Sequence, residues 1–147
     1  MRVLWVYPSP KDCLQRFLFD GTDIRGEITT LSASYQDLLA NQQYPPQVAL
    51  LFGEFLAAVS LLSTTLKNTG MITIQAQGDG PVSTVMAECS HGNKLRGIVR
   101  GDFDKIEDLS SLKELLGSAI LAITIEPEGK ERYQGVVPLD GENLSQC

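Results

Sequence analysis

The longest apolar run of the chain, residues 48–66, repeats with the period of an α-helix. At about 100° per residue its large side chains fall on one stripe, which comprises Val48, Leu51, Phe52, Phe55, Leu56, Val59, Leu62 and Leu66. Glu54 near the middle would be costly in lipid, and the polar residues share the opposite side, so a membrane span is disfavoured. We predict a buried helix of a soluble domain. Glu54 should then be partly desolvated and paired with Arg25 or Arg96.

Residues 13–20 and 23–31 predict two strands joined at Gly21 as a hairpin. The second strand alternates in side-chain character. The first is apolar on both faces, with Phe17 and Phe19 on one side and Leu14 and Leu18 on the other. Such a strand is either covered on both faces or partly exposed for a purpose.

The first residues, MRVLWVYPSP, begin with one arginine and a short apolar run. Tyr7, Pro8 and Pro10 end that run too early for a signal peptide. We interpret residues 1–12 as an N-terminal tail. A capping-box pattern of Ser34 and Asp37 predicts a short helix before the core helix.

The period changes to two after Gly70, which predicts strands at 70–77 and 82–89. Between them lies the turn Gly78-Asp79-Gly80-Pro81. A phosphate-binding loop is disfavoured there, because no lysine and no helix follow. The turn therefore indicates a hairpin.

Further strands are predicted at 95–100, 119–125 and 131–137, with the turn His91-Gly92-Asn93 before the first of them. Residues 119–125 are apolar on both faces, which is typical of a central strand covered on both sides. Ser111 and Glu114 form a capping-box pattern for a short helix that Gly117 ends.

The formal charge of −6 is concentrated at one end of the chain. Residues 1–100 carry eight acids and eight bases, whereas residues 101–147 carry ten acids and four bases. Nucleic-acid binding requires a basic surface, so the composition disfavours a nucleic-acid partner.

Three cysteines, Cys13, Cys89 and Cys147, lie far apart, and His91 is the single histidine. This spacing gives no zinc site and suggests free thiols in a reducing cytosol. A small enzyme that uses Asp79 or Cys89 is an alternative. It is weakly supported, because no base, nucleophile and orienting group occur together and Glu88 would raise the pKa of the Cys89 thiol.

Several segments together resemble the N-terminal domain of the 33 kDa chaperonin family over residues 13–147: FLFDGTDIRGEI, LLFGEFLAAVSLLSTTLK, TIQAQGDGPV, KLRGIVRG and ERYQGVVPL. The most specific pieces surround two motifs, which consist of Gly78, Asp79, Gly80, Pro81, Tyr133, Gln134 and Gly135. The resemblance implies an α+β fold of stacked, mostly antiparallel sheets with helices on one side, in β/β/α layers. It also implies an ATP-independent chaperone, or holdase, of the cytoplasm that binds unfolding client proteins.

Members of that family continue into a C-terminal module whose cysteines bind zinc and sense oxidants. Those ligands have no counterpart in these 147 residues, so we expect no zinc, no cofactor and no redox switch, and a core domain truncated at its C-terminal end. Uncovered strand edges predict a homodimer or other self-association. We expect clients to bind Phe17, Phe19, Leu14 and Leu18. An inert, merely adhesive fragment is the main alternative.

Overall fold

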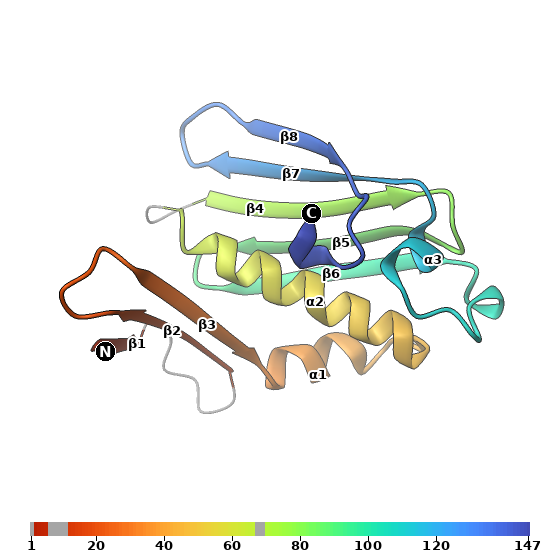
Figure 1. The fold of residues 1–147 in the computed structure, drawn as a ribbon, viewed down its shortest axis with the longest axis horizontal. Helices are drawn as coiled ribbons and strands as arrows, with labels where there is room; N and C mark the ends of the chain where they lie inside the picture. The colour runs from red at the N-terminus through yellow and green to blue at the C-terminus, as the bar shows by residue number, and fades with distance from the viewer. Residues whose placement is uncertain (1, 6–11, 67–69) are drawn as a thin grey trace.

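The structure, a computed structural model, describes residues 2–5, 12–66 and 70–147, and its strands form two antiparallel sheets (Figure 1). The three-stranded sheet has the order β1-β2-β3, with β1 at Arg2–Trp5, β2 at Asp12–Leu18 and β3 at Arg25–Leu31. The five-stranded sheet has the order β6-β5-β4-β7-β8. Its strands are β4 (Gly70–Gly78), β5 (Val82–Ser90), β6 (Lys94–Gly101), β7 (Ala119–Pro127) and β8 (Tyr133–Pro138).

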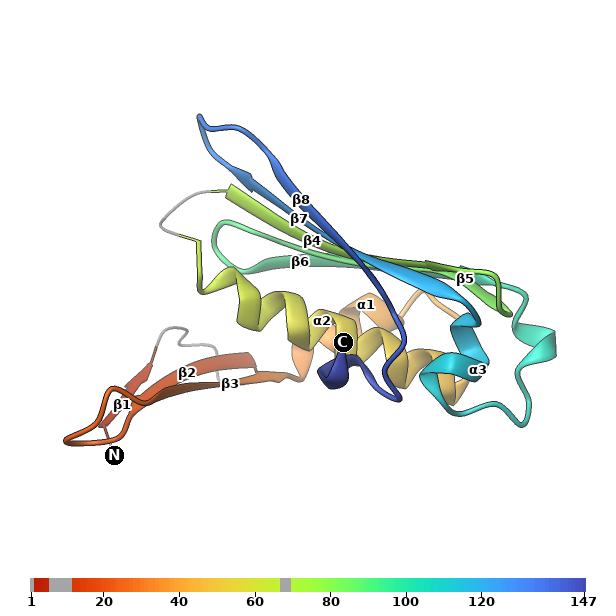
Figure 2. The same cartoon turned by 45° about the horizontal axis from the view of Figure 1, so that its top comes forward.

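Three α-helices accompany the sheets: α1 (Ala33–Leu39), α2 (Pro46–Ser63) and α3 (Leu112–Leu116). Single 3₁₀ turns occupy Phe103–Lys105 and Leu144–Gln146. The predicted α+β fold with antiparallel sheets is therefore confirmed. The helices pack on one side of the five-stranded sheet, and α2 lies between that sheet and the three-stranded sheet (Figure 2).

This layer order follows from the two unlike sides of α2. Its large apolar stripe is buried and packs against β4, β5 and β6. Its opposite side carries small residues, so the three-stranded sheet can approach closely. There the Ser60 hydroxyl hydrogen-bonds the Thr29 hydroxyl of β3 at 3.1 Å, and the Tyr35 ring of α1 covers Gly53. A helix with large side chains on one side and small ones on the other can thus pack between two sheets.

The core between α2 and the five-stranded sheet confirms the predicted central helix. Val48, Phe55 and Val59 of α2 are completely buried, as are Ala76, Val85 and Cys89 of the sheet. Within the described residues, α2 is the one helix long and apolar enough to cross a membrane. Because its apolar stripe is covered by the sheet, it forms the interior of a folded domain.

The predicted hairpins are present with regular pairing. In the ladder of β2 and β3, Leu14 faces Thr29 and Phe17 faces Gly26. Hairpins also join β4 to β5, β5 to β6 and β7 to β8. Strand β7, however, is not covered on both faces as predicted: Ile120 is 47% exposed, because α2 covers one face of the sheet.

Part of the segment interpreted as an N-terminal tail forms a strand. Arg2–Trp5 form β1, which pairs antiparallel with β2, from Arg2 opposite Leu18 to Trp5 opposite Gln15. Four residues are too few to show an alternating pattern, so only the pairing reveals this strand. Residues 6–11, which include the Tyr7, Pro8 and Pro10 that end the first apolar run, lie outside the described part of the chain.

The two predicted capping boxes differ in outcome. At α3 the Ser111 hydroxyl accepts from the Glu114 N–H, and the Glu114 carboxylate accepts from the Ser111 N–H, so this box is confirmed. At α1 the box of Ser34 and Asp37 is wrong. The helix starts after Ser32, and its first N–H groups donate to the carboxylate of Asp12 from β2.

Candidate functional site

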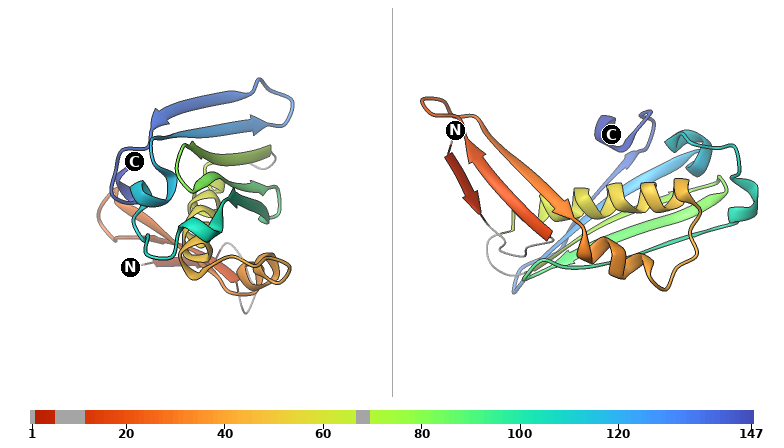
Figure 3. Two further views of the ribbon diagram at one scale, coloured as in Figure 1. Left: turned by 90° about the vertical axis from the view of Figure 1, so that its right-hand side faces the viewer. Right: turned by 90° about the horizontal axis from the view of Figure 1, so that it is seen from below.

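The hairpin of β2 and β3 extends beyond the end of α2 (Figures 2 and 3). Large apolar side chains are exposed on one face of this hairpin. Phe19 is 46% exposed, Ile24 is 61% exposed and Ile28 is 50% exposed. Alternation along the strands places them on the same face as the half-buried Phe17. We call these four residues, Phe17, Phe19, Ile24 and Ile28, the hairpin patch.

The two aromatic rings of the patch support one another. Phe17 and Phe19 meet edge to face, with ring centroids 5.7 Å apart and planes at 84°. The Phe17 ring lies directly over Gly26 of β3, where a Cβ atom would come within 2.3 Å of the ring. The absence of a side chain at Gly26 therefore lets the Phe17 ring pack on β3. The neighbouring Phe19 ring remains exposed to solvent.

The other predicted client-binding residues, Leu14 and Leu18, lie on the opposite face of β2. Leu14 is only 3% exposed, so it belongs to the interior and does not contribute to an exposed surface. Leu18 is half-buried. The sequence grouped all four residues because it could not show which face α2 would cover. It missed Ile24 and Ile28, whose shared face was visible in the alternation of the second strand.

A groove of about 750 Å³ separates the hairpin from the C-terminal half of α2. A polar contact crosses it. The Arg16 Nε lies 2.8 Å from the Glu27 Oε1, and the hydroxyl of Thr64, the C-cap residue of α2, donates to the Glu27 Oε2 at 2.6 Å. Glu27 thus connects the hairpin to the end of the core helix.

The Gly78–Pro81 motif is a structural junction. Gly78 and Gly80 let the backbone at the end of α3 press against the turn, because a Cβ at Gly78 would come within 2.0 Å of the Leu116 carbonyl oxygen. The Asp79 carboxylate accepts from the Ser118 N–H at 2.7 Å. Asp79 therefore fastens the turn to the start of β7.

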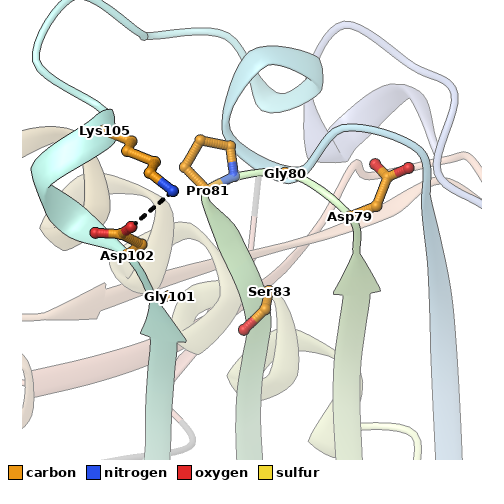
Figure 4. A pocket seen from close by; sticks show the side chains of 7 residues that line it. All are labelled: Asp79, Gly80, Pro81, Ser83, Gly101, Asp102 and Lys105. Atoms are coloured by element: carbon orange, nitrogen blue, oxygen red, sulfur yellow. Dashed lines mark ion pairs between the residues drawn. The ribbon is translucent and has the colours of Figure 1, made fainter.

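Beside this turn lies a surface pocket of about 560 Å³ (Figure 4). Its floor carries an ion pair between Lys105 Nζ and Asp102 Oδ2 at 3.0 Å, and Asp79 points away from that pair. The Ser83 hydroxyl donates to the Arg100 carbonyl oxygen. The pocket therefore offers neither a paired nucleophile and base nor a cluster of acids facing one another.

Cys89 is completely buried, and its thiol lies 3.1 Å from the Asn93 Oδ1. Burial raises the pKa of this thiol, although a hydrogen bond with Ser63 acts in the opposite direction. A buried thiol held protonated is a poor nucleophile. Among the described residues, no group of three or more His, Cys, Asp and Glu is placed to hold a metal ion.

The prediction for Glu54 is wrong. Its side chain is exposed on α2, and Arg96 instead forms an ion pair with the largely buried Glu88 of the neighbouring strand. The helical projection placed Glu54 among small residues, but it could not show that this part of the helix lies outside the cover of the hairpin.

The second motif, Tyr133, Gln134 and Gly135, lies in β8 at the edge of the five-stranded sheet. The Gln134 amide donates to the Thr124 hydroxyl of β7 at 2.9 Å. Tyr133 is exposed on the face that α2 covers further along the sheet, and a side chain at Gly135 would meet open space. Apart from Gln134, the motif therefore makes few contacts within the domain.

The sequence profile described as "Hsp33 protein" matches residues 12–147. The 33 kDa chaperonin of Ectopseudomonas mendocina is 48% identical over 136 residues, which are 92% of this chain and 46% of that protein. The 33 kDa chaperonin of Proteus mirabilis is 47% identical over 139 residues, which are 95% of this chain and 47% of that protein. The chain thus spans about half the length of these curated relatives.

A solved structure gives the same result for the fold. The crystal structure of the 33 kDa chaperonin (heat shock protein 33 homolog) of Thermotoga maritima superposes with a TM-score of 0.68 at 14% identity, over 92% of this chain and 44% of that chain. The family match at residues 12–147 includes the hairpin, the core helix and the five-stranded sheet. The chain therefore belongs to the Hsp33 protein family, a family of chaperones.

Proposed function

We propose that this chain is an ATP-independent holdase that binds unfolding proteins through exposed apolar residues of its sheets. The observation that carries the proposal is the hairpin patch, in which Phe19, Ile24 and Ile28 are each about half exposed on one face. Clustered exposed apolar side chains on a soluble domain mark an interaction site. Membership of a chaperone family supports unfolding proteins as the partner.

The composition of the hairpin patch suits a chaperone that binds its clients reversibly. Burial of apolar surface contributes about 25 cal/mol per Å², so a few half-exposed side chains give weak, reversible contacts. Such contacts are non-directional, which allows many different client sequences to bind. The groove beside Glu27 gives the hairpin room to adjust to a client.

An enzymatic role finds less support. The candidate Asp79 is engaged by the Ser118 N–H, and the candidate Cys89 is buried with its pKa raised by burial. We accordingly propose a binding protein that uses no cofactor. We also propose that it works in the cytoplasm and has no nucleic-acid partner. The net charge of −6 supports the last point.

The experiment measures light scattering of a thermally unfolding client with this 147-residue protein, once in dithiothreitol and once in peroxide. Equal suppression in both supports a holdase that needs no oxidation. Suppression only in peroxide would contradict it, and no suppression in either would favour the inert fragment. A Cys13→Ser/Cys147→Ser variant controls for intermolecular disulfides, since Cys147 is exposed.

A Phe17→Ser variant tests the strand that carries the patch. Loss of suppression with an unchanged circular dichroism spectrum would place client binding on this strand. Unfolding of the variant would instead assign Phe17 to the structure of the hairpin, where its ring already covers Gly26.

A further inference from the structure

Strand β8 forms the edge of the five-stranded sheet, next to β7 (Figure 1). The Leu139 N–H donates to the Ala119 carbonyl oxygen at 2.9 Å, at the end of the β7–β8 ladder. In an antiparallel pair, residues alternate between bonding the partner strand and pointing away from it. The N–H and C=O groups of Gln134 and Val136 therefore point outward from the sheet.

This edge lacks most of the devices that normally prevent strand pairing. Edge strands are usually protected by charged side chains, bulges or prolines. Tyr133–Pro138 contains no charged residue, its pairing with β7 is regular, and all six residues are exposed. Pro138 blocks only the last position. Tyr133 and Val136, at 63% and 54% exposed, add apolar surface on both faces of the strand.

The charges around the edge indicate what kind of segment fits. Exposed acids stand at both ends of β8, with Glu131 before it and Asp140 and Glu142 after it. The nearby Arg132 is paired with Glu126 at 3.5 Å. An apolar segment with basic flanks complements this pattern, whereas a second copy of this chain would bring another net charge of −6.

We propose that β8 binds an extended, apolar segment of an unfolding protein, flanked by basic residues, as an added strand of the sheet. The inference rests on the proposed holdase function and gives its client class. About five residues, or roughly 17 Å of extended chain, would pair with the edge. Backbone hydrogen bonds supply affinity without sequence preference, and Tyr133, Val136 and Val137 contact the alternating side chains of the client.

The test measures fluorescence polarisation of a labelled octapeptide in which valine and threonine alternate between two terminal lysines. A second peptide has every residue between the lysines N-methylated, which keeps the side chains and removes the backbone donors. We expect the methylated peptide to bind at least about tenfold more weakly. Equal binding of the two peptides would overturn the inference. Exchanging the lysines for glutamates should also weaken binding at low salt.

Two variants test the edge itself. Val136→Pro removes the outward N–H but no bond to β7, whereas Val136→Thr keeps that N–H and nearly the same shape. We expect binding to fall about tenfold in the proline variant and to stay within about twofold in the threonine variant. Equal binding by both would contradict strand addition. If the proline variant does not fold, the N-methylated peptide decides.

The outcomes separate this inference from the proposed function. Suppression of client aggregation together with equal binding of both peptides would leave the holdase standing and overturn the edge site. Edge-dependent peptide binding without suppression would overturn the holdase instead. A dimer that Val136→Pro dissociates, in a protein that does not bind the peptide, would show that a second copy occupies the edge.

Discussion

Asp12 shows how a single residue joins two elements that the sequence keeps apart. Its carboxylate accepts hydrogen bonds from the N–H groups of Ser32, Ala33 and Ser34 and from the Ser34 hydroxyl. Burial raises the pKa of Asp12, but these hydrogen bonds outweigh it, and the pKa lies below its ordinary value. The charged carboxylate therefore stabilises the start of α1 and the end of the first hairpin together.

We expect Asp12→Asn to lower the free energy of unfolding by about 1 kcal/mol at pH 7, because the amide loses the charge and one of the two acceptor oxygens. A lowered pKa contributes stability that is present above about pH 4 and lost as the pH falls through the folded-state value. The difference between wild type and variant should therefore shrink on acidification. Urea unfolding from pH 7 to pH 3 measures it, and a pH-independent difference would contradict the role of the charge.

The burial of the Cys89 thiol leads to a second prediction about a single residue. In a Cys13→Ser/Cys147→Ser variant, Cys89 is the single thiol, and it is completely buried in the wild-type structure. Because burial also raises its pKa, Ellman's reagent at pH 8 should react on the order of a hundredfold more slowly than with a free thiol. The reaction should become fast in urea. Fast reaction in the folded state would revive Cys89 as a candidate nucleophile.

At the scale of elements, the connection between the hairpin and α2 depends on a few polar contacts. Glu27 accepts from Arg16 within the hairpin and from Thr64 on the helix. Glu27→Ala should lower the free energy of unfolding by about 1 kcal/mol, since the pair is partly exposed. The substitution should also accelerate amide hydrogen exchange in β2 and β3 more than it accelerates exchange in β4 and β5.

The matched control for this prediction is Glu54→Ala. Glu54 is exposed on the same helix, so its removal should change the free energy of unfolding by less than about 0.5 kcal/mol. A similar loss of stability in both variants would show that the Glu27 contacts do not connect the hairpin specifically.

Local patterns predicted the elements well, because short-range geometry decides them. The period of residues 48–66 identified α2, and the Gly78–Pro81 turn located the hairpin of β4 and β5. The cap of α1 could not be predicted, since its carboxylate comes from Asp12, about twenty residues earlier. The exposure of Ile120 and the burial of Leu14 were also hidden, because they depend on which face α2 covers.

At the scale of the whole molecule, the single long helix α2 packs against both sheets, and it covers neither sheet completely. The large stripe of α2 covers β4, β5 and β6 and leaves β8, at the opposite edge of the sheet, exposed. Its small side and C-cap contact the β2–β3 hairpin at Thr29 and Glu27, and the tip of the hairpin extends outward (Figure 2). The hairpin patch and the β8 edge are therefore consequences of the same layer order.

The family resemblance and the match to the Hsp33 family agree on the fold, but the metal content of this chain remains a prediction. We expect elemental analysis after dialysis to find no stoichiometric zinc, because its three cysteines are too widely spaced to form a tetrahedral site. Zinc at one equivalent per chain would contradict this.

The most direct test of client binding through the hairpin patch compares a variant within the patch with a control variant that loses exposed apolar surface outside it. Phe19→Ser/Ile28→Ser removes two exposed members of the hairpin patch, and Leu50→Ser removes a side chain that is 65% exposed on α2, outside the patch. We expect the double variant to need several times more protein for half-maximal suppression of client aggregation, with the fold retained, and Leu50→Ser to act like wild type. Equal protection by all three proteins would contradict client binding through the hairpin patch.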